Sequence, residues 1–169
     1  MHISVEQIKA LREKTSAGVM ECKNALQEAE ADLERAFEIL QERGLAKAEK
    51  KKDRLASEGR IEAYVHHGSR IGAMVELNCE TDFVAKTDEF KALAHDLALQ
   101  VVATNPRFLS AEDIPEGEDV VPEEACLLEQ PFIKDESKRV RQLVAEVIAK
   151  TGEKVHVRRF VRFEVGEED

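Results

Sequence analysis

The apolar residues of this chain change their spacing at Arg60, and this change constrains the fold more than any other feature of the sequence. Before Arg60 they recur every three or four residues, which is typical of helices that bury one face. After Arg60 they alternate with polar residues, which is typical of strands with one covered face. A chain whose helices and strands are segregated in this way predicts an α+β fold.

Three short helices are predicted in residues 1–45. Ser4 can cap the first helix, the Ala17-Gly18 pair separates it from the second, and Asp32 can cap the third. Gly44 is expected to end the third helix. Because helices this short are not stable alone, they must pack on one another. We therefore expect residues 1–45 to form a compact three-helix domain.

A basic run follows this domain. Its composition predicts a solvated helical linker over residues 46–58, after which residues 59–169 form the α+β core. The basic residues of the run are Lys47, Lys50, Lys51, Lys52 and Arg54.

The core begins with a predicted β-hairpin. Two alternating runs flank a short connection at residues 67–70 that contains Gly68, a pattern typical of two antiparallel strands and their turn. In the first run Ile61, Ala63 and Val65 alternate with Glu62, Tyr64 and His66. The second run has Ile71, Ala73, Val75, Leu77 and Cys79 on one face.

Two longer helices are predicted after the hairpin. The first runs from its cap Thr87 to Asn105, and the second follows Asp135 and ends at Gly152. Each has an apolar stripe on one side, so each can cover a sheet. The simplest arrangement is a three-stranded antiparallel sheet with both helices on one face.

The segments on either side of the second helix are less regular. Residues 107–131 are acidic and broken by prolines, which predicts a loop with one helical turn after Pro122. The last strand is interrupted by Arg159, which favours a position near an edge or an interface. Its predicted apolar face consists of Val155, Val157, Val161, Phe163 and Val165.

Composition argues against several classes of function. The net charge of −10, the absence of Trp and the single Tyr leave little for binding nucleic acid, which needs a cationic surface and stacking rings. The residues from Met1 to Glu6 lack the pattern of a signal peptide, and no apolar run is long enough to span a bilayer. Three widely spaced cysteines indicate free thiols in a reducing cytoplasm.

Motifs for enzymatic chemistry are also missing. The sequence has no phosphate-binding glycine loop, no dinucleotide fingerprint and no nucleophile elbow, so we expect no bound nucleotide, cofactor or small-molecule substrate. A metal site would have to use His66, His67, Cys79 and His95, whose spacing fits no ligand pattern. Cys79 shares an alternating face with Val75 and Leu77, which favours a buried core residue over an activated thiol.

The segment of residues 78–85 stands apart because it joins a strand directly to a helix. A loop held at both ends by rigid elements suits a contact with another molecule. The simpler reading is local: Thr81 or Asp82 caps a helical turn and Phe83 fills the core. The residue pattern alone favours the simpler reading.

Three stretches of the sequence resemble elongation factor Ts. Residues 11–26 resemble the N-terminal signature of that family, residues 76–85 resemble its second signature, and residues 152–160 are similar to its closing strand. They occur in the family's order and span nearly the whole chain. Departures are mild: the family often has Gly at Ser16, Met at Val19 and Asp at Glu21.

The resemblance implies a ubiquitin-associated-like N-terminal module that docks on the GTPase domain of elongation factor Tu. It also implies a guanine-nucleotide exchange function in which Thr81, Asp82, Phe83 and Val84 disturb the magnesium site of that GTPase. Phe83 would act as an apolar wedge and should be exposed in the free protein. The contacts implied for the module are Leu11, Arg12, Thr15, Val19 and Met20.

The core matches the short bacterial type, which has a single core half and is expected to form a homodimer, with Arg159 and Cys126 as candidates for the interface. Two other functions stay open. The chain could be a helical adaptor for another protein, or a thiol hydrolase that uses Cys79.

Overall fold

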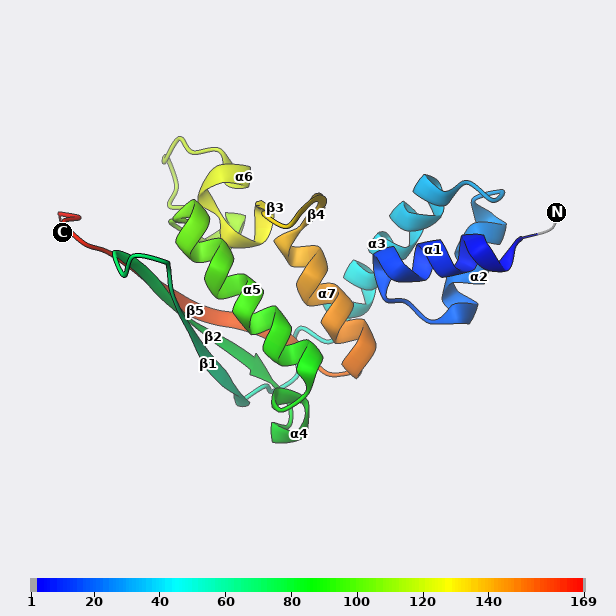
Figure 1. Ribbon diagram of the computed structural model, residues 1–169, viewed down its shortest axis with the longest axis horizontal. Helices are drawn as coiled ribbons and strands as arrows, with labels where there is room; N and C mark the ends of the chain where they lie inside the picture. The colour runs from blue at the N-terminus through cyan, green and yellow to red at the C-terminus, as the bar shows by residue number, and fades with distance from the viewer. Residues whose placement is uncertain (1–2, 169) are drawn as a thin grey trace.

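The computed structural model describes residues 3–168. Met1 and His2, which belong to the segment predicted not to be a signal peptide, lie outside the described residues, as does Asp169. A helical module lies at one end of the molecule and a sheet covered by helices lies at the other (Figure 1). The third helix runs from the module to the core and packs there (Figure 1).

The module consists of α1 (Val5–Thr15), α2 (Val19–Glu28) and α3 (Leu33–Glu49). The predicted caps are confirmed: Ser4 forms a capping box with Gln7, and the Asp32 side chain accepts hydrogen bonds from the first turn of α3. Each cap satisfies amides that a helix leaves without a partner at its start. The small apolar core between the three helices consists of Leu11, Cys22, Ala25, Leu26, Ala29 and Ala36.

The prediction that α3 ends at Gly44 is wrong. The helix continues to Glu49, and Gly44 lies against α7 (Val140–Thr151), where an added Cβ would stand 4.0 Å from the Cβ of Ala145. Glycine costs a helix about 1 kcal/mol, but it lets two helices approach closely. Packing on the core therefore outweighs local propensity, and the first residues of the predicted linker are helical and in contact with α7.

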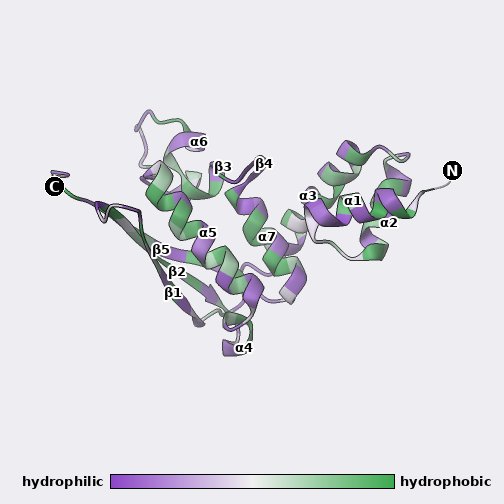
Figure 2. Cartoon of the chain, viewed as in Figure 1, coloured by the Kyte–Doolittle hydropathy of each residue, from purple (hydrophilic) through white to green (hydrophobic). Residues whose placement is uncertain are grey.

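The core sheet has the order β1-β2-β5, antiparallel throughout, with β1 (Glu58–Val65), β2 (Ile71–Cys79) and β5 (Val155–Glu164). Helices α5 (Asp88–Thr104) and α7 lie over the same face (Figure 1). Apolar residues recur along both helices (Figure 2), and their buried members share one core with β2. The predicted α+β class and the placement of both helices on one face are confirmed.

The faces of the outer strands differ from expectation. In β1 the partly buried residues are Arg60, Glu62 and Tyr64, on the side of α5, whereas Ile61, Ala63 and Val65 are exposed on the other side. The position of β1 at the edge of the sheet explains this for Glu62 and Tyr64, because both residues contact His95 of α5. The Glu62 Oε1 atom lies 3.6 Å from the His95 Nδ1 atom, and the ring centres of Tyr64 and His95 are 5.7 Å apart.

The predicted apolar face of the last strand is wrong because β5 contains a register shift. Leu77 pairs with Val157 but Glu76 pairs with Arg159, so the strand has an extra residue at Arg158. A bulge reverses the side on which later residues point. Val155 and Val157 are therefore buried in the core, whereas Val161 and Phe163 lie on the face opposite to α5 and α7.

Short elements fill residues 106–139. The predicted helical turn after Pro122 is confirmed as α6 (Pro122–Ala125), with short 3-10 turns at Ala111–Asp113 and Leu127–Glu129. The sequence did not predict the small hairpin of β3 (Pro131–Phe132) and β4 (Asp135–Arg139), so α7 begins later than expected, at Val140. None of the helices within residues 3–168 is both long and apolar enough to cross a membrane.

Candidate functional site

The segment Thr81–Val84, called here the tip, lies where β2 ends and the short helix α4 (Asp82–Ala85) begins. Thr81 caps α4, since its hydroxyl accepts a hydrogen bond from the Val84 amide at 3.3 Å. A second cap follows at once: the Thr87 hydroxyl donates to the Val84 carbonyl at 2.7 Å and accepts from the Phe90 amide at the start of α5. Two consecutive caps leave this junction little freedom.

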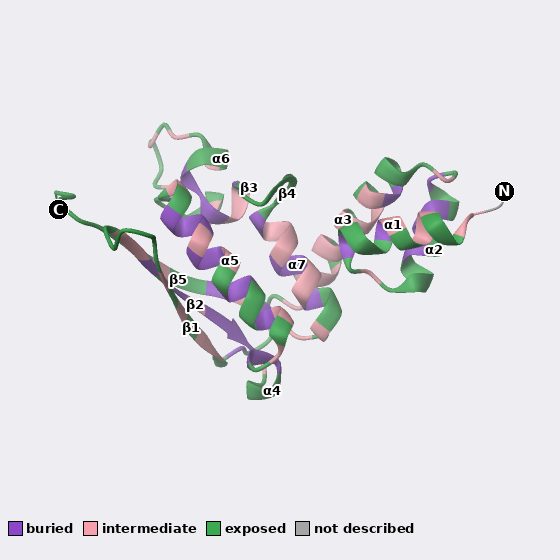
Figure 3. Ribbon diagram, in the orientation of Figure 1, coloured by how far each residue is buried: buried purple, intermediate pink, exposed green. Residues whose placement is uncertain are grey.

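Phe83 projects from this junction into solvent. Its exposed fraction is 78%, whereas Val84 and Ala85 beside it are buried. Figure 3 shows the contrast on a larger scale: β2 is buried along much of its length, and α4 at the end of the sheet carries an exposed outer side. The expectation that Phe83 is exposed in the free protein is confirmed.

Asp82 lies next to Phe83 and also faces solvent. Its carboxylate forms an ion pair with Lys86 one turn later, at 2.8 Å. The hydrogen bond from Lys86, reinforced by its charge, lowers the pKa of Asp82 below its ordinary value. The tip thus presents an ionised carboxylate and an aromatic ring side by side.

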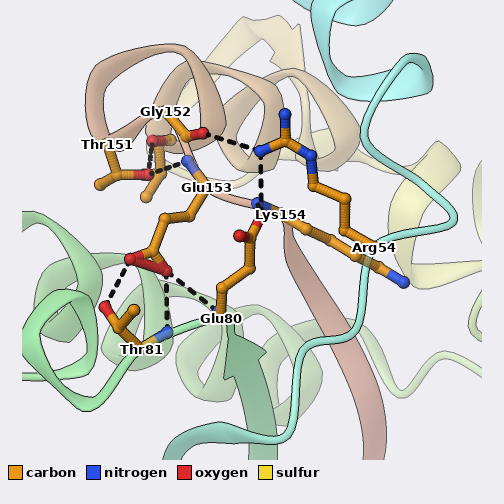
Figure 4. A network of polar contacts seen from close by, with 8 residues as sticks. Arg54, Glu80, Thr81, Thr151, Gly152, Glu153 and Lys154 are labelled. Atoms are coloured by element: carbon orange, nitrogen blue, oxygen red, sulfur yellow. Dashed lines mark hydrogen bonds and ion pairs between the residues drawn. The ribbon is translucent and has the colours of Figure 1, made fainter.

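Glu153 contacts the tip from a distant part of the sequence. Its carboxylate accepts hydrogen bonds from the amides of Glu80 and Thr81, at 3.0 Å and 2.9 Å, and from the Thr81 hydroxyl (Figure 4). Sequence reasoning missed this residue, because no local pattern links positions 72 residues apart. The one available signal was its place in the third stretch that resembles the family.

Cys79 has the environment of a core residue. Its side chain is fully buried and its thiol donates to the Thr81 carbonyl at 3.1 Å. Burial, followed by the negative charge of Glu153, raises its pKa to about 11. A nucleophilic cysteine needs the opposite, an exposed thiol with a lowered pKa. The thiol hydrolase reading therefore has no support at this position.

The five predicted contact residues of the N-terminal module do not share one environment. Arg12, Val19 and Met20 are exposed, around the start of α2 and the adjacent part of α1. Leu11 and Thr15 are buried, with the Thr15 hydroxyl donating to the Leu11 carbonyl at 2.8 Å. In the free protein these two residues pack under the surface formed by Arg12, Val19 and Met20 and are not part of it.

Three of the five basic residues of the run are paired with carboxylates in the described part of the chain, whereas Lys50 and Lys51 form no ion pair there. Lys47 pairs with Glu21, Lys52 with Glu49, and Arg54 with Glu80. A phosphate backbone would have to compete with these carboxylates. Within the described part of the chain, no cluster of three or more His, Cys, Asp or Glu side chains is placed to hold a metal ion.

Comparison with known proteins gives consistent matches. The model of the family described as "Elongation factor TS" matches residues 3–121 and 118–167. The Elongation factor Ts of Thermotoga neapolitana is 50% identical over 196 residues, covering 99% of this chain and 100% of that protein. Those of Carboxydothermus hydrogenoformans and Moorella thermoacetica are 49% and 48% identical and cover 98% of this chain, and 90% and 96% of their own lengths.

The alignment with the Thermotoga protein is longer than this chain. It spans 196 positions, whereas this chain has 169 residues, a difference of 27. The two segments that match the family model meet at residues 118–121. These residues belong to the acidic loop before α6, at the end of the core opposite to the tip (Figure 1).

Proposed function

This chain belongs to the elongation factor Ts family, and we propose from that premise that it is a guanine-nucleotide exchange factor for elongation factor Tu. In this proposal it is not an enzyme: it binds the GDP complex of the GTPase and promotes release of the nucleotide. The tip reaches the region of the partner's magnesium site, with Phe83 as an apolar wedge and Asp82 as a hydrogen-bond acceptor for displaced backbone.

The observation that carries the proposal is the exposure of Phe83 on a rigid frame. Moving an aromatic side chain out of water lowers the free energy, so a ring that is 78% exposed in the free protein can stabilise a complex in which a partner covers it. Two helix caps and the Glu153 carboxylate hold the backbone that presents it. The backbone that carries the ring therefore does not have to become ordered when a partner binds, which raises the affinity of the contact.

Nucleotide release follows from linkage. Magnesium bridges phosphate oxygens and protein ligands, so moving the elements that hold it weakens the grip on GDP. A wedge that binds only the opened form shifts the equilibrium by its differential affinity. A buried Phe with a charge-assisted hydrogen bond supplies about 2–4 kcal/mol, or roughly a hundredfold in nucleotide affinity. By reciprocity, rebinding of nucleotide displaces the factor.

The N-terminal module supplies the second contact. We propose that residues 1–45 dock on the GTPase domain through exposed Arg12, Val19 and Met20, while Leu11 and Thr15 keep the underlying helices in place. Residues 46–58 connect this module to the core of residues 59–169. Packing of α3 on α7 supports a fixed distance between the module and the tip.

We further propose that the chain forms a homodimer through the uncovered face of its sheet. This face carries five exposed apolar side chains: Ile61, Val65, Met74, Val161 and Phe163. A continuous apolar face on a sheet is typical of an interface, and two copies related by a twofold axis can cover it mutually. Arg159 lies on the same face, whereas Cys126 is buried in the core and is not part of it.

We also propose that the protein acts in the cytoplasm, where translation elongation occurs. In this proposal the protein needs no cofactor, and it binds no nucleic acid, membrane or small-molecule substrate. The net charge of −10 and the near absence of stacking rings support the exclusion of nucleic acid.

Release of labelled GDP from elongation factor Tu tests the proposal. The wild-type chain should accelerate release when added to the preformed complex with excess unlabelled nucleotide. If release is no faster with the chain than without it, the exchange function is wrong, and the adaptor reading gains support if the chain still binds the complex.

A further inference from the structure

The carboxylate of Glu153 binds the backbone at the start of the tip. The Glu153 Oε2 atom accepts from both the Glu80 and Thr81 amides, and its Oε1 atom accepts from the Thr81 hydroxyl (Figure 4). These amides lie past the end of β2 and before the first turn of α4. In the described part of the chain, neither has another hydrogen-bond acceptor. Without Glu153 this stretch depends on water for its hydrogen bonds.

The position of Glu153 is itself fixed by the fold. It follows Gly152, which ends α7 with a left-handed φ of 74°, a conformation that favours glycine. The Glu153 amide then donates to the Thr151 hydroxyl at 3.4 Å. The turn between α7 and β5 thus directs the carboxylate back toward the end of β2.

A second carboxylate reinforces the arrangement in the reverse direction. Glu80 accepts from the Lys154 amide at 2.6 Å and from the Arg54 guanidinium at 3.3 Å, and Arg54 also donates to the Gly152 carbonyl at 3.4 Å. The carboxylate of Glu153 in the α7–β5 turn therefore binds backbone at the end of β2, and the carboxylate of Glu80 at the end of β2 binds backbone in the turn (Figure 4). Hydrogen bonds to ionised acceptors are stronger than neutral ones, which makes this crossed pair a rigid connection.

We propose that Glu153 is a positioning residue for exchange: by binding the Glu80 and Thr81 amides and the Thr81 hydroxyl, it holds the backbone in the one arrangement that presents Phe83 to the partner. In this proposal Glu153 makes no contact with the GTPase and acts through the backbone of Glu80 and Thr81. This inference rests on the proposed role of the tip. It predicts that the charge and reach of Glu153 control the rate of nucleotide release rather than docking of the chain.

The Glu153→Gln substitution tests this prediction. A glutamine keeps the size but offers one oxygen in place of two, and its NH₂ group cannot accept from the amides or the hydroxyl. At saturating factor we expect release of labelled GDP to be about tenfold slower, the loss of roughly one charge-assisted hydrogen bond. The concentration for half-maximal release should change by less than about twofold. The matched control is Glu116→Gln, at an exposed carboxylate in the acidic loop, which should leave both values unchanged.

A measurement on the free protein separates positioning from general stability. Hydrogen exchange should show lost protection at the Glu80 and Thr81 amides in Glu153→Gln, with protection of the buried Leu97 in α5 unchanged. If Leu97 also loses protection, Glu153→Gln has destabilised the whole core, and Glu153→Asp is used as the test variant instead. This variant keeps the charge on a shorter side chain and should fall between wild type and Glu153→Gln in release rate.

The outcomes are distinguishable from failure of the exchange function. The role of Glu153 would be overturned, and the role of the tip left intact, by one combination of results. In it, release of GDP is fast with wild type, slow with Phe83→Ala, and as fast with Glu153→Gln as with wild type. Slower release with unchanged protection at Glu80 and Thr81 would overturn the role of Glu153 as well. No acceleration by wild type overturns the exchange function, while the protection data still decide whether Glu153 holds this backbone.

Discussion

Phe83 and Val84 are neighbours in the chain but lie in opposite environments. Val84 is 6% exposed and packs into the core, whereas Phe83 is 78% exposed. Within a helical turn, adjacent side chains point about 100° apart, so anchoring one of them inside directs the other outward. The buried Val84 and the caps Thr81 and Thr87 therefore determine where the Phe83 ring projects.

Removal of the Phe83 ring should impair exchange without unfolding the protein. For Phe83→Ala we expect release of GDP from elongation factor Tu to slow by about tenfold to a hundredfold, because the wedge contributes most of its free energy in the opened complex. The free energy of unfolding should change by less than about 0.5 kcal/mol, since the ring is exposed. The matched control is Leu55→Ala, at an exposed apolar side chain of the linker, which should not slow release.

The thiols should be inert in the native protein. Cys22, Cys79 and Cys126 are all free and buried, and burial raises the pKa of each. At pH 8 a thiol-specific colorimetric reagent should label none of them at the rate seen in denaturant. Cys79→Ala should leave GDP release within about twofold of wild type. Fast labelling of Cys79, or loss of exchange in Cys79→Ala, would revive the thiol reading.

A charge on the sheet face should disrupt self-association. Phe163→Glu places a carboxylate among exposed apolar residues, so burial against a second copy would cost the desolvation of that charge. We expect the dimer to dissociate at concentrations at least about tenfold higher than wild type, as measured by sedimentation velocity. Val5→Glu, at an exposed residue of the N-terminal module, is the control and should not affect association. A monomeric wild type would contradict the dimer.

Acid should loosen the connection between the end of β2 and the α7–β5 turn. The hydrogen bond from the Lys154 amide, and then Arg54, lower the pKa of Glu80 below its ordinary value of 4.5. Because the folded pKa is the lower one, the ionised carboxylate contributes stability above the unfolded pKa, and this contribution is lost as the pH falls through the folded value.

The variant Glu80→Gln should therefore lose less stability than wild type between about pH 5 and pH 3. Denaturant unfolding across this range measures the difference. Glu116→Gln is again the matched control, and its pH dependence should follow wild type. Equal slopes for Glu80→Gln and wild type would show that Glu80 titrates alike in the folded and unfolded states.

Local signals predicted much of the fold. The caps at Ser4, Asp32 and Thr87, the hairpin turn after Val65 and the stop at Gly152 all rest on a few neighbouring residues, and the structure confirms each of them. These features are decided by backbone hydrogen bonds within one turn of the chain. Alternation also placed the buried face of β2 correctly, because that strand lies in the centre of the sheet.

The candidate site was only half predictable. The residue pattern located a strand-to-helix junction at Thr81, but it favoured a buried Phe83, and only the family resemblance reversed that expectation. Contacts of Glu153 and Arg54 with this junction are separated from it by 72 and 26 residues, and no spacing rule reaches so far.

The sequence by itself determined the three-helix start, the α+β class, the central strand and the place of the tip, because each depends on periodicity or on caps that form locally. Tertiary structure alone decided the rest. Close packing on Ala145 allows α3 to continue past Gly44. The extra residue at Arg158 makes Val161 and Phe163 point away from the core. The carboxylates of Glu80 and Glu153, each bound to the other segment's backbone, fix the start of the tip. Each of these depends on what another segment presents in space, and a local pattern contains no information about that.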